Sequence, residues 1–200
     1  MEDKDRCISN KVNIDKKNNK KSVNIINSLK IVHWNANSLN NKKKEFDQFI
    51  IKDLNPDIIS INETKLSEFR ANMLLVYDNY NVLHKSRHSN KNGAGGVAIM
   101  IKKEINFIQI VDKDFEDLEI IVINIFINNL SYTIISYYNA PQLNLNIQIL
   151  TNLNKKFPNL LILGDLNAKS TCFGCKTSNQ NGSLLEELIT DSNLIIINSI

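Results

Sequence analysis

The stretch Leu160-Leu161-Ile162-Leu163-Gly164-Asp165-Leu166-Asn167-Ala168 decides the fold. Its four large apolar residues predict a buried strand that is too short to form a helix of its own. Asp165 and Asn167 follow at the carboxyl end of this strand, spaced so that both side chains can face the same side. Ligand sites gather at such strand ends when a sheet is flanked by helices. An aspartate that activates water, beside an amide that binds a phosphoryl oxygen, suits phosphate chemistry. The alternative is an ordinary turn in which both side chains bond the local backbone.

The composition is that of one globular domain. Two hundred residues with 42% hydrophobic content can bury a substantial core. No apolar stretch approaches the length of a membrane span, and the charged N-terminus has no signal-peptide segment. We therefore expect an intracellular chain with no membrane partner. The three cysteines are sparse and odd in number, which does not indicate a disulfide framework.

The net charge of +3 is unevenly distributed along the chain. Residues 1–44 have a balance of +7, and the remaining residues have a balance of −4. The globular part therefore has no broad basic surface of its own for a nucleic-acid backbone. Residues 1–28 alternate polar residues with isolated apolar ones and show no sustained period. This pattern predicts a disordered, basic lead-in before a domain over residues 29–200.

Apolar periodicity in residues 29–200 predicts alternating strands and helices. Strands are expected at 29–34, 57–61, 80–84, 96–101, 119–127, 132–138 and 160–163, with a further strand beginning at 194–197. A hairpin is expected around Asn128-Asn129. One helix carries Phe46, Phe49, Ile50 and Leu54 at helical spacing, and others are expected at 145–157 and 183–191. Ser183 is expected to cap the last helix, with Glu186 in capping-box position. The mixture of hairpins and crossovers predicts an α/β sandwich.

Polar side chains follow four of these strands where the apolar pattern breaks. They are Asn35 and Asn37, Glu63, Tyr138, and Asp165 with Asn167. Together they predict one cluster at a single rim of the sheet. Two carboxylates suit a hard cation, and amides with a phenol suit phosphate oxygens.

The order of these motifs resembles that of the endonuclease/exonuclease/phosphatase superfamily. The motifs are Trp34–Leu39, Asn62–Lys65, Gly95–Ile99, Tyr138 with Pro141, and Gly164–Ala168. More narrowly, the sequence resembles the apurinic-type endonuclease domain of Jockey-like non-LTR retrotransposons. That likeness rests on the phrase Trp34-Asn35-Ala36-Asn37 and on the match over 164–170, 173–174, 181–182 and 184–188. The resemblance covers residues 29–200. It implies a layered α/β sandwich of the DNase I-like type, with two mixed β-sheets flanked by helices.

The resemblance implies roles on the metal side of the site. Glu63 matches the principal Mg²⁺ ligand, and Mn²⁺ is a possible substitute. Asn35 matches the residue that lies beside the metal and holds the active-site network. Asn37 is expected to make a second metal contact, weaker than in those relatives that carry an acidic residue there.

On the phosphate side, Tyr138 matches the tyrosine that bonds to the scissile phosphate, and the adjacent Tyr137 takes that role if the register slips. Asp165 matches the aspartate that activates the attacking water, and Asn167 matches the amide that holds the phosphate. The implied reaction is hydrolysis of a phosphodiester in double-stranded DNA. The nick would leave a 3′-hydroxyl that primes reverse transcription, in the nucleus, by a parent protein that carries an RNA-directed DNA polymerase.

The family pattern continues beyond residue 200 with a late aspartate, a Ser-Asp-His segment and the last strands of the second sheet. We therefore expect an incomplete domain with an exposed edge strand, and little or no nicking by these 200 residues. The alternatives are an abasic-site repair endonuclease or a phosphoesterase of the same superfamily. A third alternative is a degenerate domain that only binds DNA or protein.

Other residues that resemble functional ones have ordinary interpretations. His33 is expected to be a packed or edge residue of its strand, and His84 and His88 are expected to be solvated. Cys172-Phe173-Gly174-Cys175 has metal-ligand spacing but no second pair of ligands, so chance spacing is the preferred interpretation. The glycines at 93–96 lack the lysine of a P-loop and are expected to permit close backbone packing at a strand start.

Overall fold

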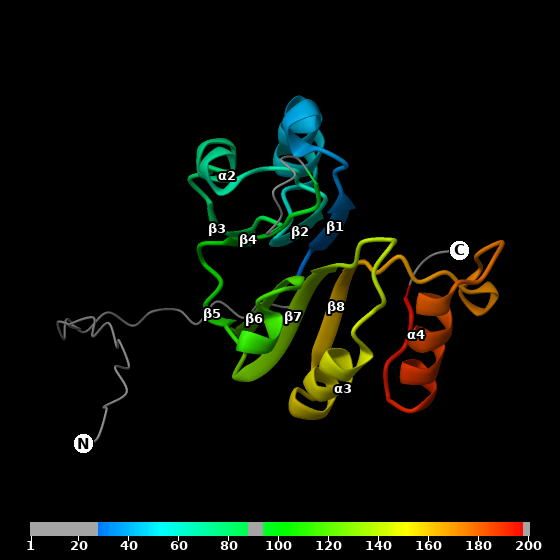
Figure 1. Cartoon of the computed structure of the whole chain (residues 1–200). Coiled ribbons are helices and arrows are strands. Elements are labelled where there is room, and N and C mark those ends of the chain that lie inside the picture. Colours follow the sequence, from blue (N-terminus) through cyan, green and yellow to red (C-terminus); the bar gives the residue numbers. More distant parts are fainter. Residues whose placement is uncertain (1–27, 88–93, 198–200) are drawn as a thin grey trace, which may run out of the picture.

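The computed structural model describes residues 28–87 and 94–197. The predicted disordered lead-in, except residue 28, lies outside the described residues, as does His88. Two four-stranded sheets face each other, with helices on their outer sides (Figure 1). This arrangement confirms the predicted layered α/β sandwich of two mixed sheets.

The first sheet has the strand order β1-β2-β4-β3. Its strands are β1 (Ile31–Asn35), β2 (Ile58–Asn62), β3 (Tyr80–Lys85) and β4 (Val97–Lys102). The second sheet has the order β5-β6-β7-β8. Its strands are β5 (Phe107–Ile110), β6 (Glu119–Ile127), β7 (Leu130–Tyr138) and β8 (Leu160–Asp165). β1 pairs parallel to β2, and β7 pairs parallel to β8, while the other pairs are antiparallel.

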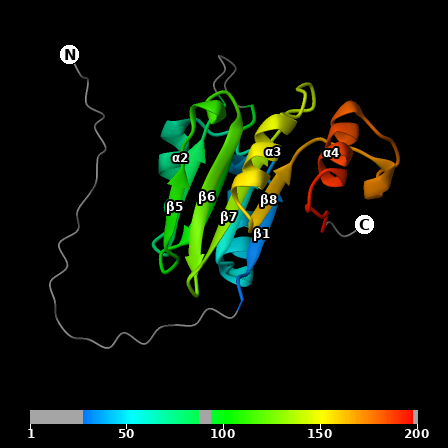
Figure 2. The same ribbon diagram turned by 90° about the horizontal axis from the view of Figure 1, so that it is seen from below.

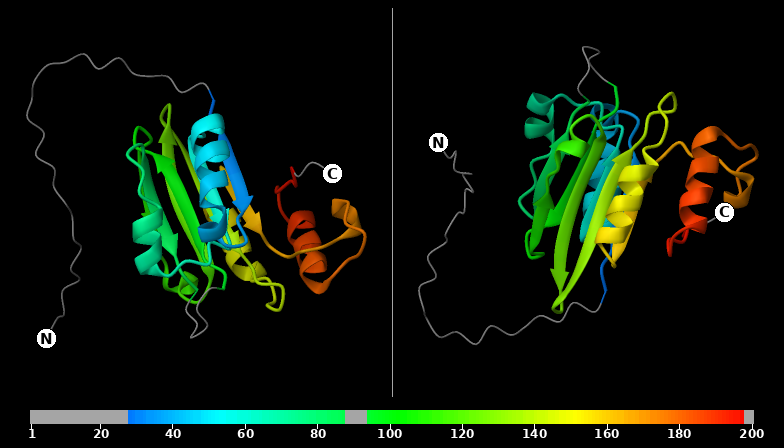
Figure 3. Two further views of the ribbon diagram at one scale, coloured as in Figure 1. Left: turned by 90° about the horizontal axis from the view of Figure 1, so that it is seen from above. Right: turned by 60° about the horizontal axis from the view of Figure 1, so that its bottom comes forward.

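Helical segments cover the outer face of each sheet (Figures 2 and 3). Over the first sheet lie η1 (Leu39–Lys42), α1 (Lys43–Glu45), η2 (Phe46–Leu54) and α2 (Glu68–Leu74). The second sheet is accompanied by η3 (Lys113–Phe115), α3 (Ile147–Lys156), η4 (Thr171–Phe173) and α4 (Gln180–Thr190). α3 lies across the face of the second sheet, whereas α4 lies to the side of β8. None of the helices in the described residues is long and apolar enough to cross a membrane.

Three apolar layers hold the sandwich together. The central layer fills the space between the sheets with fully buried side chains such as Ile58, Ile99 and Ile123. An outer layer joins the first sheet to its helices, and another joins the second sheet to α3 and α4. The predicted hairpin is confirmed: Asn128 and Asn129 connect β6 to β7, both with positive φ, a conformation that asparagine tolerates.

The first predicted helix packs differently from its predicted pattern. Phe49 is 59% exposed and Leu54 is 43% exposed, so the expectation that both face the core is wrong. η2 is a π-helix, and the Asn55 N–H bonds the carbonyl of Ile50, five residues earlier, at 3.0 Å. In the wider turn of this helix, Phe46 and Ile50 of the predicted row still pack against the first sheet, joined by Ile51, while Phe49 and Leu54 face outward.

The last helix begins earlier than predicted, so Ser183 is not its cap. Asn179 caps α4, because its side chain accepts the N–H of Gly182 at 2.8 Å. Glu186 is not part of a capping box; it accepts a hydrogen bond from the hydroxyl of the buried Ser170. The Asn179 cap and the hydrogen bond from Ser170 to Glu186 both come from the loop that precedes α4. No local sequence pattern specifies how this loop folds.

The prediction of a strand at 194–197 is also wrong, since these residues form no strand in the structure. Ile195 and Ile197 are 79% and 72% exposed. β8 was expected to be buried, yet all six of its residues are partly exposed. The reason is its position: within the described residues β8 pairs only with β7, so it is an edge of the second sheet (Figure 2). This agrees with the expected exposed edge strand.

Asp57 links the start of β1, the start of β2 and the end of β4 at one end of the first sheet, and it gives the fold a testable pH dependence. Burial raises the pKa of Asp57, but hydrogen bonds from the Lys30 N–H at 2.7 Å and the Lys102 ammonium at 2.9 Å outweigh it, so the pKa lies below its usual value. A depressed pKa stabilises the fold above the ordinary carboxyl pKa and loses this effect as the pH falls through the folded-state value.

We therefore expect Asp57→Asn to lower the free energy of unfolding by about 1 kcal/mol at pH 7. The difference from wild type should shrink as the pH falls below about 4. Urea denaturation of wild type and Asp57→Asn at pH 7 and at pH 3 measures the difference in unfolding free energy at each pH. An equal difference at pH 7 and pH 3 would contradict the depressed pKa of Asp57.

Candidate active site

Five of the six predicted site residues meet at one rim of the sandwich. Asn35 ends β1, Glu63 follows β2, Tyr138 ends β7, Asp165 ends β8 and Asn167 lies two residues beyond. The Asn35 amide nitrogen donates to Glu63 Oε1 at 2.9 Å and to Asp165 Oδ2 at 3.0 Å. One side chain therefore joins carboxylates that come from the two sheets.

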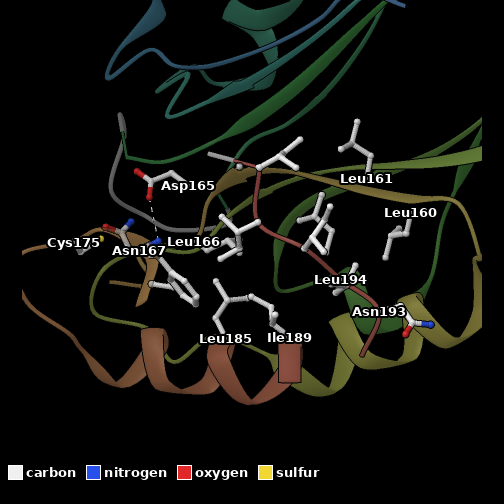
Figure 4. Close-up of a pocket in the computed structure, with 17 residues that line it drawn as sticks. Leu160, Leu161, Asp165, Leu166, Asn167, Cys175, Leu185, Ile189, Asn193 and Leu194 are labelled. Atoms are coloured by element: carbon white, nitrogen blue, oxygen red, sulfur yellow. Dashed lines mark hydrogen bonds between the residues drawn. The ribbon is translucent and has the colours of Figure 1, made fainter. Parts of the chain in front are cut away.

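Asp165 is fixed by its backbone and by its carboxylate. Its N–H donates to Asn62 Oδ1 at 2.7 Å, and its Oδ1 accepts the N–H of Asn167 at 3.1 Å (Figure 4). The Asn167 amide nitrogen donates to the carbonyl oxygen of Asn139 at 2.9 Å. The ordinary-turn alternative is therefore partly right for the local bonds, yet the same carboxylate also reaches Asn35 on the other sheet. The two residues therefore belong to a hydrogen-bonded cluster that spans the two sheets.

Asp165 and Asn167 lie at one end of a hollow of about 390 Å³ (Figure 4). The rest of this hollow is lined largely by apolar side chains of β8, α4 and residues 194–197. Apart from Asn193 at the far end, the polar side chains of the hollow, Asp165, Asn167 and Cys175, lie at the rim end, where the strands finish. The apolar remainder supplies packing surface and no reactive group.

Tyr138 lies against Glu63, which settles which of the two adjacent tyrosines belongs to the rim. Burial, the negative charge of Glu63 and a hydrogen bond to Glu63 together raise the pKa of Tyr138 to about 12, while the charge of Arg87 opposes the shift. The phenol therefore stays protonated at neutral pH and is a hydrogen-bond donor. Tyr137 points the other way, into the apolar layer shared with α3, and is 1% exposed.

Asn37 is the predicted residue that lies apart from the two carboxylates. It is exposed, and its backbone N–H donates to Asn35 Oδ1 at 3.1 Å. Its side-chain oxygen accepts from the Lys65 ammonium at 2.5 Å, and the same ammonium lies 3.4 Å from Glu63 Oε2. The Lys65 ammonium therefore lies between the side chains of Asn37 and Glu63.

The backbone at the rim is held in an uncommon conformation. Asn37, Glu63, Lys65 and Asn167 all have positive φ, between 43° and 53°. For residues other than glycine this region costs energy and is found where the surrounding structure imposes it, often at functional sites. Three of these four positions are predicted site residues.

The residues at the rim fit a divalent cation of the oxygen-preferring kind. Glu63 and Asp165 bring two carboxylates to one amide nitrogen, and the Lys65 ammonium already lies beside Glu63 as a cation. Mg²⁺ is commonly held by one or two carboxylates together with waters. No group of three or more His, Cys, Asp or Glu suited to a metal occurs in the part of the chain that the structure describes.

A buried polar ladder beneath the site was not predicted. Ser60 and Asn62, both fully buried in β2, face Ser136 in β7: the two serine hydroxyls are 2.7 Å apart, and the Asn62 amide nitrogen lies 3.4 Å from Ser136 Oγ. Since Asn62 also holds the backbone of Asp165, the ladder ties the site to the core. The signal was present in the sequence as two polar residues at alternate positions of an isoleucine-rich strand.

Neither of the two histidines in the described residues, His33 and His84, hydrogen-bonds to Glu63 or Asp165. His33 Nδ1 lies 3.0 Å from Ser60 Oγ, in agreement with a packed residue; burial lowers its pKa and the Asp165 charge partly opposes this. The expectation that His84 is solvated is wrong, since its side chain is 5% exposed. Its Nε2 lies 3.0 Å from Thr64 Oγ1, because the residues after β2 and helix α2 cover the end of β3. Cys172 and Cys175 are free thiols.

Comparison with known proteins identifies the group to which this architecture is similar. The model of the Endonuclease/Exonuclease/phosphatase family matches residues 32–194. The endonuclease domain of TRAS1, a telomere-specific non-LTR retrotransposon, is 21% identical, with a TM-score of 0.68 over 86% of this chain and 74% of that one. An AP endonuclease from Leishmania major is 16% identical, with a TM-score of 0.61 over 82% and 67%. No curated protein matches.

A third similar structure carries nucleic acid. It is the 3′ phosphatase NExo from Neisseria bound to a product DNA hairpin, 18% identical, with a TM-score of 0.55 over 82% of this chain and 71% of that one. At these identities the likeness concerns the fold.

Proposed function

The chain belongs to the Endonuclease/Exonuclease/phosphatase family, and on that premise we propose that it is a metal-dependent DNA endonuclease domain. Members of the family are phosphodiester hydrolases. The observation that carries the proposal is the single amide of Asn35 joining Glu63 to Asp165 across the two sheets, with Tyr138 and Asn167 beside them. This is a set of carboxylates, amides and a protonated phenol suited to a phosphodiester.

Glu63, with Asp165 next to it, would hold the divalent cation, for which we propose Mg²⁺ with Mn²⁺ as a substitute. When bound, the cation stabilises negative charge on the phosphate and on the leaving oxygen. Asn37 would contribute only if Lys65 left its amide oxygen, where it now lies at 2.5 Å. Lys65 keeps positive charge beside Glu63 in the structure as it stands.

The remaining steps belong to the protein's own side chains. Asp165 is held on three sides by Asn35, Asn62 and Asn167, so its carboxylate can orient a water and accept its proton. The phenol of Tyr138 remains protonated and donates a hydrogen bond to a phosphate oxygen. The amide of Asn167, which donates to the Asn139 carbonyl in the structure, would bind the same phosphate.

We further propose that the domain serves a Jockey-like non-LTR retrotransposon in the nucleus. It would nick double-stranded target DNA to leave a 3′-hydroxyl, and the parent protein would carry the reverse transcriptase that extends it. The similarity to the TRAS1 endonuclease fold supports this choice, as do the motifs around Trp34 and Gly164. We also propose that these 200 residues alone nick little, since no histidine of the described residues hydrogen-bonds to the site carboxylates.

An abasic-site endonuclease or a phosphoesterase is the second candidate. The similarity to an AP endonuclease from Leishmania major and to a 3′ phosphatase from Neisseria favours this alternative. Cleavage of abasic duplex, intact duplex and a small phosphorylated compound, compared under the same conditions, discriminates between them. Preference for intact duplex supports the retrotransposon assignment, and binding without any cleavage supports a degenerate DNA-binding domain.

Removing the Glu63 carboxylate tests the metal site directly. We expect Glu63→Gln to weaken Mn²⁺ binding by at least about tenfold, because a ligand to a hard cation becomes a neutral amide. Electron paramagnetic resonance of Mn²⁺ measures the affinity, and anisotropy of a labelled duplex measures DNA binding with and without Mg²⁺. Glu187→Gln, an exposed carboxyl on α4, is the matched control. Equal Mn²⁺ affinity in both variants would refute the assignment of Glu63.

A further inference from the structure

Arg87 lies beside the site but has no part in the chemistry proposed above. It follows β3 of the first sheet, and its Nε lies 2.5 Å from Glu119 Oε1. Its guanidinium carbon is 5.7 Å from the centre of the Tyr138 ring. Glu119 begins β6 and pairs with Tyr138 at the end of β7, both in the second sheet. Arg87 therefore crosses from one sheet to the other next to the rim tyrosine.

Glu119 is itself tightly held, which fixes the arginine. It is 8% exposed, and its second oxygen accepts the backbone N–H of Gly96. A buried carboxylate is stable only with such partners. Gly95 has φ of 62°, and a Cβ there would lie 2.1 Å from Glu119 Oε2 and 2.6 Å from Arg87 Nη2, so any other residue would be strained and would displace this pair of side chains. The close backbone packing expected of these glycines is confirmed for residues 95 and 96 by the hydrogen bonds that their carbonyls accept from the N–H groups of Lys65 and Thr64, and the Arg87–Glu119 pair packs beside Gly95.

The Arg87 guanidinium leaves part of its hydrogen-bonding capacity unused. Its Nη2 is buried and has no hydrogen-bond partner in the structure as described. An unmade buried donor is costly, and native structures rarely keep one without a reason. Here the planar cation lies near the face of an aromatic ring, an attractive arrangement that a lysine reproduces less well. Contact with Tyr138 accounts for a position that hydrogen bonding alone does not favour.

We propose that Arg87 is a positioning residue for Tyr138: anchored on Glu119, it holds the tyrosine ring so that the phenol meets the phosphate. The proposal deepens the proposed function and rests on it, since the phenol position matters only if Tyr138 binds a phosphate. Arg87 itself touches no reacting group. Its ion pair also ties the two sheets together at the rim where each contributes half of the site.

The position of the ring can be measured without DNA. In chain labelled with 3-fluorotyrosine, the ¹⁹F signal of Tyr138 is identified as the one lost in Tyr138→Phe. We expect Arg87→Met to shift or broaden that signal. Arg87→Lys should do the same while keeping the charge opposite Glu119 and the stability to urea. Lys85→Met, which removes a half-buried cation bonded to the Phe115 carbonyl, is the matched control and should leave the signal unchanged.

A merely structural ion pair would predict a different result. In that case Arg87→Lys would resemble wild type in the ¹⁹F spectrum, and this outcome would overturn the proposal. An unchanged signal in Arg87→Met would overturn it as well. Because the lysine variant retains the charge pair, the measurement remains decisive if the methionine variant does not fold.

Duplex binding in Ca²⁺ then tests the functional consequence. Loss of one hydrogen bond to a charged phosphate weakens binding by about tenfold, so we expect that effect for Tyr138→Phe and a similar one for Arg87→Lys. The double variant should bind no more weakly than Tyr138→Phe, because both changes remove the same contact. Additive losses would overturn the positioning role. Absence of any duplex binding by wild type would instead count against the proposed function, and the ¹⁹F result would still decide the role of Arg87.

Discussion

Asp165→Asn is expected to nick supercoiled plasmid at least about 100-fold more slowly than the wild-type chain, because the amide cannot accept a proton from water. The change keeps an acceptor oxygen for the Asn167 N–H, which now lies 3.1 Å from Asp165 Oδ1. The backbone bond to Asn62 is also retained, so the fold should be little affected. The rate is measured with the chain in excess over plasmid, since these 200 residues are expected to nick little.

Asp191→Asn is the control for this measurement. It removes the same charge from an exposed position at the end of α4, away from the rim. The control should nick at the wild-type rate. If Asp165→Asn also did so, Asp165 would not be the group that activates water, and any cleavage would come from another site or from a contaminant.

Gly164→Ala is expected to lower the free energy of unfolding by about 3 kcal/mol or more. Gly164 pairs with Tyr137 in the parallel register of β7 and β8. A Cβ at this position would lie 1.9 Å from the carbonyl oxygen of Tyr137, a backbone atom that cannot turn aside as a side chain can. The second sheet must therefore distort where Asp165 leaves it, and the loss of stability should be accompanied by loss of the site.

Urea denaturation measures this cost, with Gly174→Ala as its control. Gly174 is exposed and has φ of 80°, so an alanine there pays only the local penalty of about 1–2 kcal/mol for a left-handed conformation. A Gly164→Ala chain as stable as the Gly174→Ala chain would show that β8 can move away from β7. The close register described above would then be wrong.

Most strands were predictable because each carries its own apolar signal. β6 and β7 have long alternating or continuous apolar runs, and the two asparagines between them suit a tight turn. α2 and β5 were missed for the opposite reason. α2 leaves Phe69 and Met73 exposed and shows no clear apolar face, and β5 has four residues whose only partner is β6. Their structure depends on neighbours that local sequence does not reveal.

The candidate site was predictable in its membership, since polar residues at strand ends were few. Its connections were not. The amide of Asn35 reaches Asp165, which is 130 residues away in sequence, and Lys65 separates Asn37 from Glu63. The contacts of Asn62, at the end of a strand, and of Arg87, in a loop, could not be predicted from the patterns around them. Such roles arise from distances between segments, which periodicity does not encode.

The sequence by itself determined the alternating elements, the rim at which Asn35, Glu63, Tyr138, Asp165 and Asn167 would meet, and the family, because apolar period and short motifs are local properties of a chain. The tertiary structure alone decided that 194–197 is not a strand, that β8 is an edge, that Asn62 bonds the backbone of Asp165, and that Arg87 lies against the ring of Tyr138. Each of these depends on whether a partner from elsewhere in the chain is present. Hydrogen bonds and ion pairs across the two sheets are satisfied only after the sheets have packed.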